Sequence, residues 1–195
     1  MTKNEYNQPI GETLPNFSLG EMPTIKVLEG VYCRLEHLSA EKHLDDLSEF
    51  YLEANTNPAD WTYLFLSPLK DKEELRTLLT KQETSADPYY FSIVSKETGK
   101  AIGTLSLMHI EPKYRVIEVG AVTYSDTLKH TRIATEAQYL LAKYVFETLQ
   151  YRRYKWKCDS LNMPSRRAAE RLGFVYEGTF RQAVVYKGRS RDTAW

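Results

Sequence analysis

The chain has 195 residues, of which 42% are hydrophobic and 27% are charged, and its formal net charge is zero. This length suits one α/β domain with an extension, or at most two small domains, and leaves room for a substantial core. Because the charges balance, no overall field recruits nucleic acid or a membrane surface.

The first 24 residues are rich in Asn, Pro, Gly and Glu and show no periodicity, which predicts an N-terminal extended arm over residues 1–24. A strand is expected at 31–35, where β-forming residues gather. Ser39 can then cap a helix whose apolar residues fall on one face. A structured loop over 55–68 contains Asn-Pro and several aromatic residues.

A second helix is predicted from about Asp71 to Glu83, followed by a strand at 89–95. A hairpin turn with Gly99 at its positive-φ position leads into the next strand, at 101–110. The strand at 116–124 is long and mainly apolar, and we expect it to be buried on both faces.

A helix over about 131–149 comes next, and a strand over 154–159 follows it. Proline in a first turn and Gly173 in the C-terminal cap frame another helix. An antiparallel pair, 175–185 with 191–195, turns around Lys187-Gly188. The order predicts one α/β (α+β) domain over 25–195, with helices on both faces of the sheet. The chain stops inside the last predicted strand, so a fragment is one interpretation.

The two cysteines, Cys33 and Cys158, lack the spacing of a zinc site or a redox pair, so we expect two reduced thiols in or near the core. No apolar run approaches transmembrane length, and no secretory signal is evident. We therefore expect a cytoplasmic protein, monomeric or homodimeric, with no metal and no membrane partner.

The junction between the strand at 116–124 and the following helix is a candidate anion site. A helix N-terminus presents unpaired N–H groups and a partial positive charge, which suit a phosphate. The basic run Lys129-His130-Thr131-Arg132 lies at that point. From the residues alone, a solvated helix start with a few charges is the favoured interpretation.

Three ordered segments carry a family resemblance. Lys129-His130-Thr131-Arg132-Ile133-Ala134 follows the frame Gln/Arg-x-x-Gly-x-Gly/Ala, with Lys129 and Arg132 as departures. Asn162-Met163-Pro164-Ser165 and Leu172-Gly173-Phe174 follow downstream. Together these segments resemble the GNAT superfamily of N-acetyltransferases, in particular the branch of ribosomal-protein N-terminal acetyltransferases. The resemblance covers about residues 28–195.

The resemblance implies a GNAT-like fold, with a mixed, mostly antiparallel sheet of about seven strands. It also implies direct transfer of an acetyl group from acetyl-CoA to a primary amine. Strand amides would hold the pantetheine, loop amides the pyrophosphate, and an asparagine the coenzyme arm. These coenzyme-binding residues are Val119, Gly120, Ala121, Val122, Lys129, His130, Thr131, Arg132, Ile133, Ala134, Thr135 and Asn162.

Two catalytic residues are implied in the same way. Glu118 is the candidate general base that removes a proton from the amine, and a structural carboxylate is its alternative. Ser165 is the candidate general acid for the leaving thiolate, and a helix-capping serine is its alternative. Tyr124 is a second candidate acid. His109 is expected to pack within its strand, and His130 to lie exposed in its loop.

The acceptor pocket is expected beside the loop between the first two helices. Asp60, Trp61 and Tyr63 could hold a cationic amine there, and a hydrophobic plug beneath the loop is the alternative. A small molecule or a peptide would serve as acceptor, and the branch favours a protein or peptide N-terminus.

Two other functions remain open at this stage. A GNAT-like domain that binds acyl-CoA without catalysis is one, because Arg132 stands where the family prefers glycine. A nucleic-acid surface is the other, because residues 152–191 carry eleven Lys or Arg against three acids.

Overall fold

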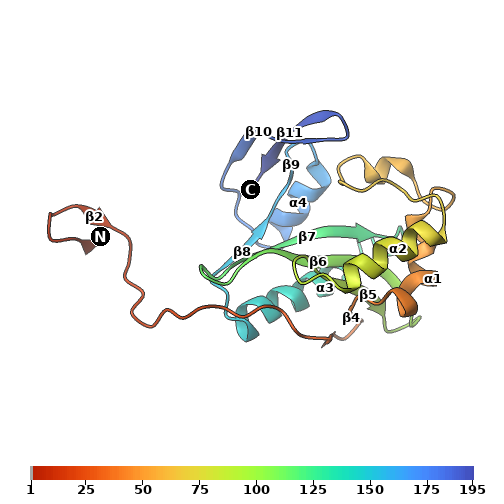
Figure 1. The fold of residues 1–195 in the computed structure, drawn as a ribbon, viewed down its shortest axis with the longest axis horizontal. Helices are drawn as coiled ribbons and strands as arrows, with labels where there is room; N and C mark the ends of the chain where they lie inside the picture. Colours follow the sequence, from red (N-terminus) through yellow and green to blue (C-terminus); the bar gives the residue numbers. More distant parts are fainter. Residues whose placement is uncertain (1) are drawn as a thin grey trace.

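The computed structural model describes residues 2–195, so Met1 of the predicted arm lies outside the described residues. Figure 1 shows a twisted sheet flanked by helices, with a long N-terminal segment reaching away from it. The elements up to the second long helix are β1 (Thr2–Lys3), β2 (Pro9–Ile10), β3 (Val27–Glu29), β4 (Cys33–His37), α1 (Ala40–Tyr51), the 3₁₀ turn η1 (Pro58–Trp61) and α2 (Lys72–Glu83). The remaining elements are β5 (Tyr89–Ser95), β6 (Ala101–Glu111), β7 (Val116–Tyr124), α3 (Arg132–Lys143), the π-helical turn η2 (Tyr144–Thr148), β8 (Arg153–Trp156), β9 (Cys158–Asp159), α4 (Met163–Arg171), β10 (Thr179–Tyr186) and β11 (Arg189–Ala194).

The strands form a large sheet and a small one. Six strands lie in the order β3-β4-β5-β6-β7-β8, and every pair is antiparallel except β7 with β8. Three strands lie in the order β10-β11-β9. Only Lys157 separates β8 from β9, so one stretch of chain leaves the large sheet and joins the small one. The predicted fold class is confirmed, with the strands of the domain divided between these two sheets and β1 paired with β2 in the arm.

Helices cover both faces of the large sheet, as expected. The α3 face buries side chains from the alternate positions of four strands, among them Leu35, Phe91, Leu105 and Ile117. The opposite face packs against α1 and α2, where Leu47 and Leu75 are fully buried. Burying one such side chain contributes about 1.5–3 kcal/mol, so these two clusters hold the sheet between its helices.

Local signals in the sequence account for several element ends. The Ser39 hydroxyl accepts from the amide of Lys42, and the Asp71 carboxylate accepts from two amides of the first turn of α2. Gly99 has φ 72° and Gly173 has φ 90°, both in the left-handed region that favours glycine. The predicted cap at Ser39 and the predicted positions of Gly99 and Gly173 are therefore confirmed, and the structure adds the cap at Asp71.

One strand of the large sheet was not predicted, and three predicted elements differ from the structure. Strand β3 went unpredicted, and the last hairpin starts at Thr179 because residues 174–178 form a loop. The helix predicted at 131–149 widens into a π-helical turn over its last residues. The expectation that 116–124 is buried on both faces is wrong beyond Val119, because β8 stops pairing there and leaves Ala121 exposed.

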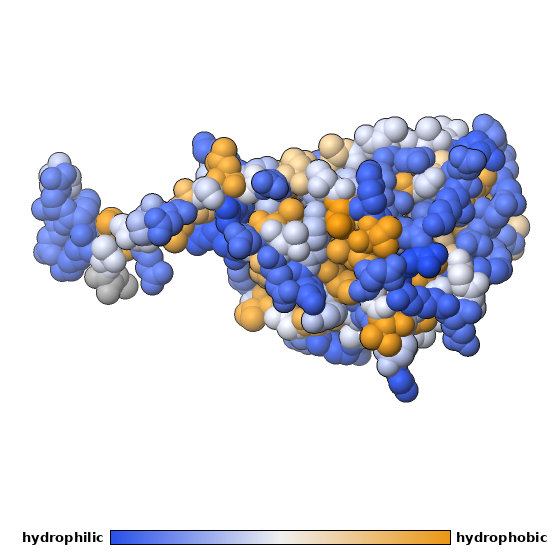
Figure 2. All heavy atoms as spheres, turned by 90° about the horizontal axis from the view of Figure 1, so that it is seen from below, coloured by the Kyte–Doolittle hydropathy of each residue, from blue (hydrophilic) through white to orange (hydrophobic). Residues whose placement is uncertain are grey.

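The arm is anchored only near the domain. The amide of Gly20 donates to the carbonyl of Pro112 at 3.0 Å, and the hydroxyl of Tyr151 donates to the carbonyl of Glu21 at 3.0 Å. The Arg115 guanidinium donates to the carbonyl of Ser18 at 2.8 Å. Before Ser18 the arm projects past the domain and ends in the small β1–β2 hairpin (Figures 1 and 2).

Both cysteines are free thiols and buried, as predicted. Within residues 2–195 no helix has the length and apolar character needed to cross a membrane.

Candidate active site

The parallel pairing of β7 with β8 ends in an opening. The last paired residues are Val119 and Trp156, after which the chain of β8 turns away to pair with β11 as β9. Along that edge, the backbone of β7 beyond Val119 has no strand partner among the described residues. Such an edge presents amide donors to whatever lies in the opening.

A β-bulge reorients the backbone at the same point. Gly120 pairs with Ser106 and Thr123 pairs with Thr104, so two residues of β7 face one residue of β6. Ala121, within the bulge, has φ 49°, an uncommon value for a residue with a side chain. A Cβ on Gly120 would lie 2.2 Å from the sulfur of Met108, so the Met108 side chain packs over Gly120. The predicted pantetheine segment, Val119 to Val122, therefore has an irregular, partly exposed backbone.

The predicted phosphate loop forms the start of α3. Thr131 caps the helix, its hydroxyl accepting from the amide of Ala134 at 3.2 Å. The amides of Arg132 and Ile133, which open the helix, have no acceptor within residues 2–195. His130, with φ 61°, turns the chain into the helix and lies exposed, as expected.

Arg132, one of the two departures from the family pattern, fits this backbone. Arg132 is the first helical residue, so the position needs no left-handed conformation. Its guanidinium lies 6.0 Å from the ring centre of Tyr32, over the loop between β3 and β4. The Arg132 side chain thus points to Tyr32.

Lys129 connects the predicted coenzyme loop, residues 129–134, to the loop between α1 and α2 that carries Asp60, here called the acceptor loop. Its ammonium lies 2.7 Å from the carboxylates of both Asp60 and Asp126. Burial alone would lower the pKa of Lys129, but the bonds to Asp126 and Asp60 outweigh it and raise that pKa. One residue predicted for the coenzyme and one predicted for the acceptor are therefore in contact.

Glu118 is a buried carboxylate with two cationic or ionisable partners. Its side chain is only 6% exposed, and one oxygen lies 2.8 Å from the ammonium of Lys157 and 3.0 Å from Nδ1 of His109. The ammonium of Lys157 also lies 4.1 Å from the ring centre of Trp195. The site therefore already holds one primary ammonium against a carboxylate and an aromatic ring.

The expectation for His109 is wrong. It was expected to pack within its strand, but it has φ 47° where β6 and β7 shift register, and its side chain is 54% exposed. This irregularity turns the ring out of the core and onto Glu118.

Ser165 and Asn162 lie together at the start of α4. The side chain of Asn162 caps the helix by accepting from the amide of Ser165 at 3.2 Å. The hydroxyl of Ser165 accepts from the indole of Trp156 at 3.0 Å, and its own O–H lies beside the thiol of Cys158. Since Trp156 and Lys157 are adjacent in an extended chain, they point to opposite faces. Ser165 and Glu118 therefore lie on opposite sides of the opening.

Tyr124, the second candidate acid, is held by the core. The amide of Gln138 donates to its hydroxyl at 2.8 Å, and burial raises the pKa of Tyr124 to about 12. A phenol with so high a pKa is a weaker proton donor than an unperturbed one.

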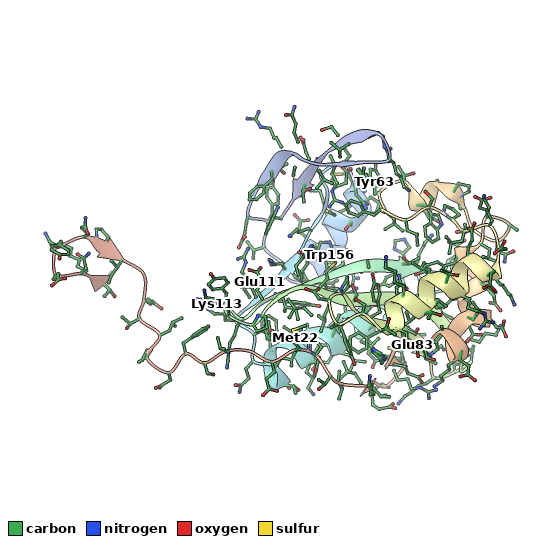
Figure 3. All side chains as sticks on the ribbon, viewed as in Figure 1. Met22, Tyr63, Glu83, Glu111, Lys113 and Trp156 are labelled. Atoms are coloured by element: carbon green, nitrogen blue, oxygen red, sulfur yellow. The ribbon has the colours of Figure 1, made fainter. Side chains whose placement is uncertain are left out.

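The acceptor loop is tied to the C-terminal hairpin. Trp61 is buried against Tyr51, with ring centres 5.3 Å apart, and its indole donates to the hydroxyl of Thr56. Tyr63 is half-buried and, in the view of Figure 3, lies between the η1 loop and the C-terminal strands. Lys187 at the hairpin tip donates to the carbonyl of Trp61 at 2.8 Å. The tip of the hairpin thus holds the loop that carries Asp60 and Tyr63.

Most of the C-terminal basic residues have partners inside the chain. Arg153 pairs with Glu177, Lys155 with Glu111 at 3.3 Å, and Lys157 with Glu118. Others donate to carbonyls or hydroxyls, namely Arg166, Arg171, Lys187 and Arg189. These bonds hold seven of the eleven basic side chains of residues 152–191 in contacts within the fold.

Sequence analysis missed three residues that shape the site: Lys157, His109 as a partner of Glu118, and Glu136. Glu136 accepts from three amides of the loop between β3 and β4 and thereby fixes α3. Each of these contacts joins residues on different strands or helices, which no local pattern reveals. The offset of two between Lys155 and Lys157, next to a strand bearing Glu118, is the one signal that could have suggested the ion pair.

The opened parallel strand pair, the bulged edge of β7 and the start of α3 lie at the same end of the large sheet. Residues 35–175 match the family described as "Acetyltransferase (GNAT) domain", and the chain belongs to that family.

Solved structures and a curated relative agree with this assignment. A GCN5-related N-acetyltransferase from Brucella melitensis is 44% identical, covers 93% of this chain and 82% of its own, and superposes with a TM-score of 0.89. A probable GNAT-family acetyltransferase from Chromobacterium violaceum ATCC 12472 is 34% identical, covers 96% and 92%, and has a TM-score of 0.87. The uncharacterized N-acetyltransferase p20 of Bacillus licheniformis is 28% identical over 142 residues, 70% of this chain and 78% of that protein.

Proposed function

We propose that the chain transfers an acetyl group from acetyl-CoA directly to a primary amine, with Glu118 as general base and Ser165 as general acid. The observation that carries the proposal is the ion pair of Glu118 and Lys157 at the opening between β7 and β8. In that pair a carboxylate already binds a primary ammonium, next to a strand edge with free amides.

The coenzyme would lie along the opening. The amides of Arg132 and Ile133, with the partial positive charge of α3, would hold the pyrophosphate. The bulged edge from Val119 to Val122 would hold the pantetheine and polarise the thioester carbonyl. The capping bond of Asn162 uses its oxygen and leaves its NH₂ group to donate to the coenzyme arm.

The acceptor amine would approach from the face of Glu118. An alkylammonium has a pKa of about 10, so it must lose a proton before it attacks. To receive that proton, Glu118 exchanges Lys157 for the acceptor ammonium. Asp60 and Tyr63 of the acceptor loop would hold the rest of the acceptor, and Trp61 supports that loop from below.

The leaving thiolate would receive its proton from the other face. Ser165 keeps its own hydroxyl proton while accepting from Trp156, and it would turn that O–H from the thiol of Cys158 to the leaving thiolate. The family resemblance extends to the branch of ribosomal-protein N-terminal acetyltransferases, and we propose a peptide N-terminus or a small amine as the acceptor.

The test is turnover of a panel of primary amines by Glu118→Gln, with Glu111→Gln as a matched control. Glu111 also pairs with a lysine of the β8 strand, but its side chain is 47% exposed and it lies away from the opening. We expect Glu118→Gln to lower kcat by about 10²- to 10⁴-fold, the usual contribution of a general base, with an unchanged Kd for CoA. Equal kcat for Glu118→Gln and the native chain at every pH would overturn the role of Glu118.

Folding must be separated from catalysis in this test. Removing one partner of a buried ion pair costs about 3–5 kcal/mol, because it leaves the other charge unpaired. The double variant Glu118→Gln, Lys157→Met removes both charges, so we expect it to regain stability and to stay inactive. Coenzyme binding by every variant without acetyl transfer by the native chain would instead favour a non-catalytic acyl-CoA-binding domain.

A further inference from the structure

Three cationic side chains at alternate positions of the last hairpin face the acceptor loop. The two near the tip are hydrogen bonded: Lys187 donates to the carbonyls of Trp61 and Leu66 at 2.8 and 2.9 Å, and Arg189 donates to that of Thr62 at 2.7 Å. These bonds fix the loop against the hairpin. The third cation, Arg191, lies deeper and behaves differently.

Arg191 is a buried charge without a partner. The residue is 7% exposed, its Nε is shielded from solvent, and its guanidinium makes no hydrogen bond or ion pair within residues 2–195. The rings of Phe65 and Tyr186 cover it, at 5.2 and 5.8 Å from the ring centres. Aromatic faces attract the charge but accept none of its in-plane N–H bonds, and the Nε–H of Arg191 stays buried without an acceptor within the described residues, whereas buried charges in proteins are normally paired.

The neighbouring acid forms no ion pair with Arg191 within the described residues. Asp159, on the adjacent strand, uses its carboxylate to accept from the hydroxyl of Tyr186 at 2.7 Å and the amide of Leu161 at 2.9 Å. Thr193, two residues beyond Arg191 on the same face of β11, is 4% exposed, and its hydroxyl also has no partner within the described residues. Two orphaned polar groups therefore lie side by side on one strand.

The same strand face leads to the proposed base. Arg191, Thr193 and Trp195 alternate along the chain, and such residues point to one side. The ring of Trp195 lies under the ammonium of Lys157, which pairs with Glu118. An acceptor whose amine reaches Glu118 could therefore extend along β11 to Arg191.

We propose that Arg191 and Thr193 bind a carboxylate of the acceptor, so that the substrate is an amine that also carries a carboxylate. This inference rests on the proposed function and names the substrate class of that site. A guanidinium matches a carboxylate with two parallel N–H bonds, and the threonine hydroxyl supplies a third donor. The covering ring of Phe65, from the acceptor loop, would shield this contact from water.

The test uses ω-amino carboxylates of increasing chain length, each paired with its own carboxamide. At the best length we expect the native chain to favour the carboxylate by about 10- to 100-fold in kcat/KM, the range for hydrogen bonds to a charged group. Arg191→Met removes the charge at similar volume and should bring that ratio to about one, while carboxamide turnover persists. Thr193→Val, which removes only the hydroxyl, should lower the ratio by a smaller factor.

A second measurement is independent of turnover. Succinate should raise the Tm of the native chain and leave that of Arg191→Met unchanged, because only a ligand of the folded site stabilises it. Without succinate, Arg191→Met should melt at or above the native Tm, since the variant loses an unpaired buried charge.

Two outcomes would overturn the inference. One is an unchanged carboxylate preference in Arg191→Met, with or without a lower Tm. The other is weaker binding of CoA by Arg191→Met than by the native chain. That result would assign Arg191 to a coenzyme phosphate. If no amine is acetylated but succinate still stabilises the native chain alone, the proposed function fails and the anion site stands.

Discussion

Glu136 fixes the start of the coenzyme-loop helix to the rest of the sheet. One carboxylate oxygen accepts from the amide of Val31 at 2.6 Å, and the other accepts from those of Tyr32 and Cys33 at 2.7 and 2.8 Å. Three successive amides thus surround one negative charge. Each hydrogen bond to a charged group contributes about 1.5–3 kcal/mol.

Glu136→Gln keeps the shape but changes this contact. An amide has one accepting oxygen, so it retains two bonds at most and sets an NH₂ group against the remaining N–H. We expect the free energy of unfolding to fall by about 2 kcal/mol, which lowers Tm by about 4–8 °C in a chain of this size. Calorimetry at neutral pH measures the change in Tm. The control is Glu147→Gln, since Glu147 is an exposed partner of Lys143 on the same helical stretch. Equal Tm values for Glu136→Gln and the native chain would refute the reasoning.

The pH dependence identifies the charge as the cause. Burial opposes ionisation of Glu136, but the amides of Val31, Cys33 and Tyr32 outweigh it and hold its pKa below the usual range. A carboxyl whose folded pKa is lowered contributes stability that is complete above its unfolded pKa of about 4.3 and is lost as the pH falls. The difference in stability between the native chain and Glu136→Gln should therefore shrink below about pH 4. A difference that persists undiminished at pH 3 would mean that shape matters rather than charge.

Two further predictions concern the coenzyme loop and the thiols. In a titration, Asp60→Asn should tighten CoA binding by up to about five-fold, because the carboxylate of Asp60 competes with phosphate for Lys129. The magnitude follows from the contribution of a partly exposed ion pair, up to about 1 kcal/mol. Weaker CoA binding by Asp60→Asn would contradict this competition. Burial, with the neighbouring Glu136 carboxylate, raises the pKa of Cys33 to about 12, and burial raises that of Cys158. At pH 8 a chromogenic disulfide should thus label neither thiol until the chain is unfolded, and fast labelling of the native chain would count against their burial.

Local sequence patterns predicted most of the fold. Periodicity located α2 and the strands β5 to β7, and the capping residue Ser39 marked where α1 begins. Strand β3 escaped because three exposed or half-exposed residues leave no alternation to detect. The change of sheet at Lys157 also escaped, since a strand looks the same whichever neighbour it pairs with.

The candidate site was predicted less completely than the fold. The start of α3 was found because it combines a helix signal with a family frame. The partners of Glu118 and Glu136 come from strands and loops far away in the sequence, so only the folded chain brings them together. Arg191 looked like one basic residue among many, and its lack of a partner is a property of the packed structure alone.

The central claim, acetyl transfer from acetyl-CoA to an amine, is tested most directly by incubating the purified chain with acetyl-CoA and a panel of primary amines, followed by mass spectrometry. We predict that CoA is released only when an acceptor amine is present and that the amine gains one acetyl group per CoA. Failure of the chain to bind CoA, or release of CoA without an acetylated amine, would contradict the account.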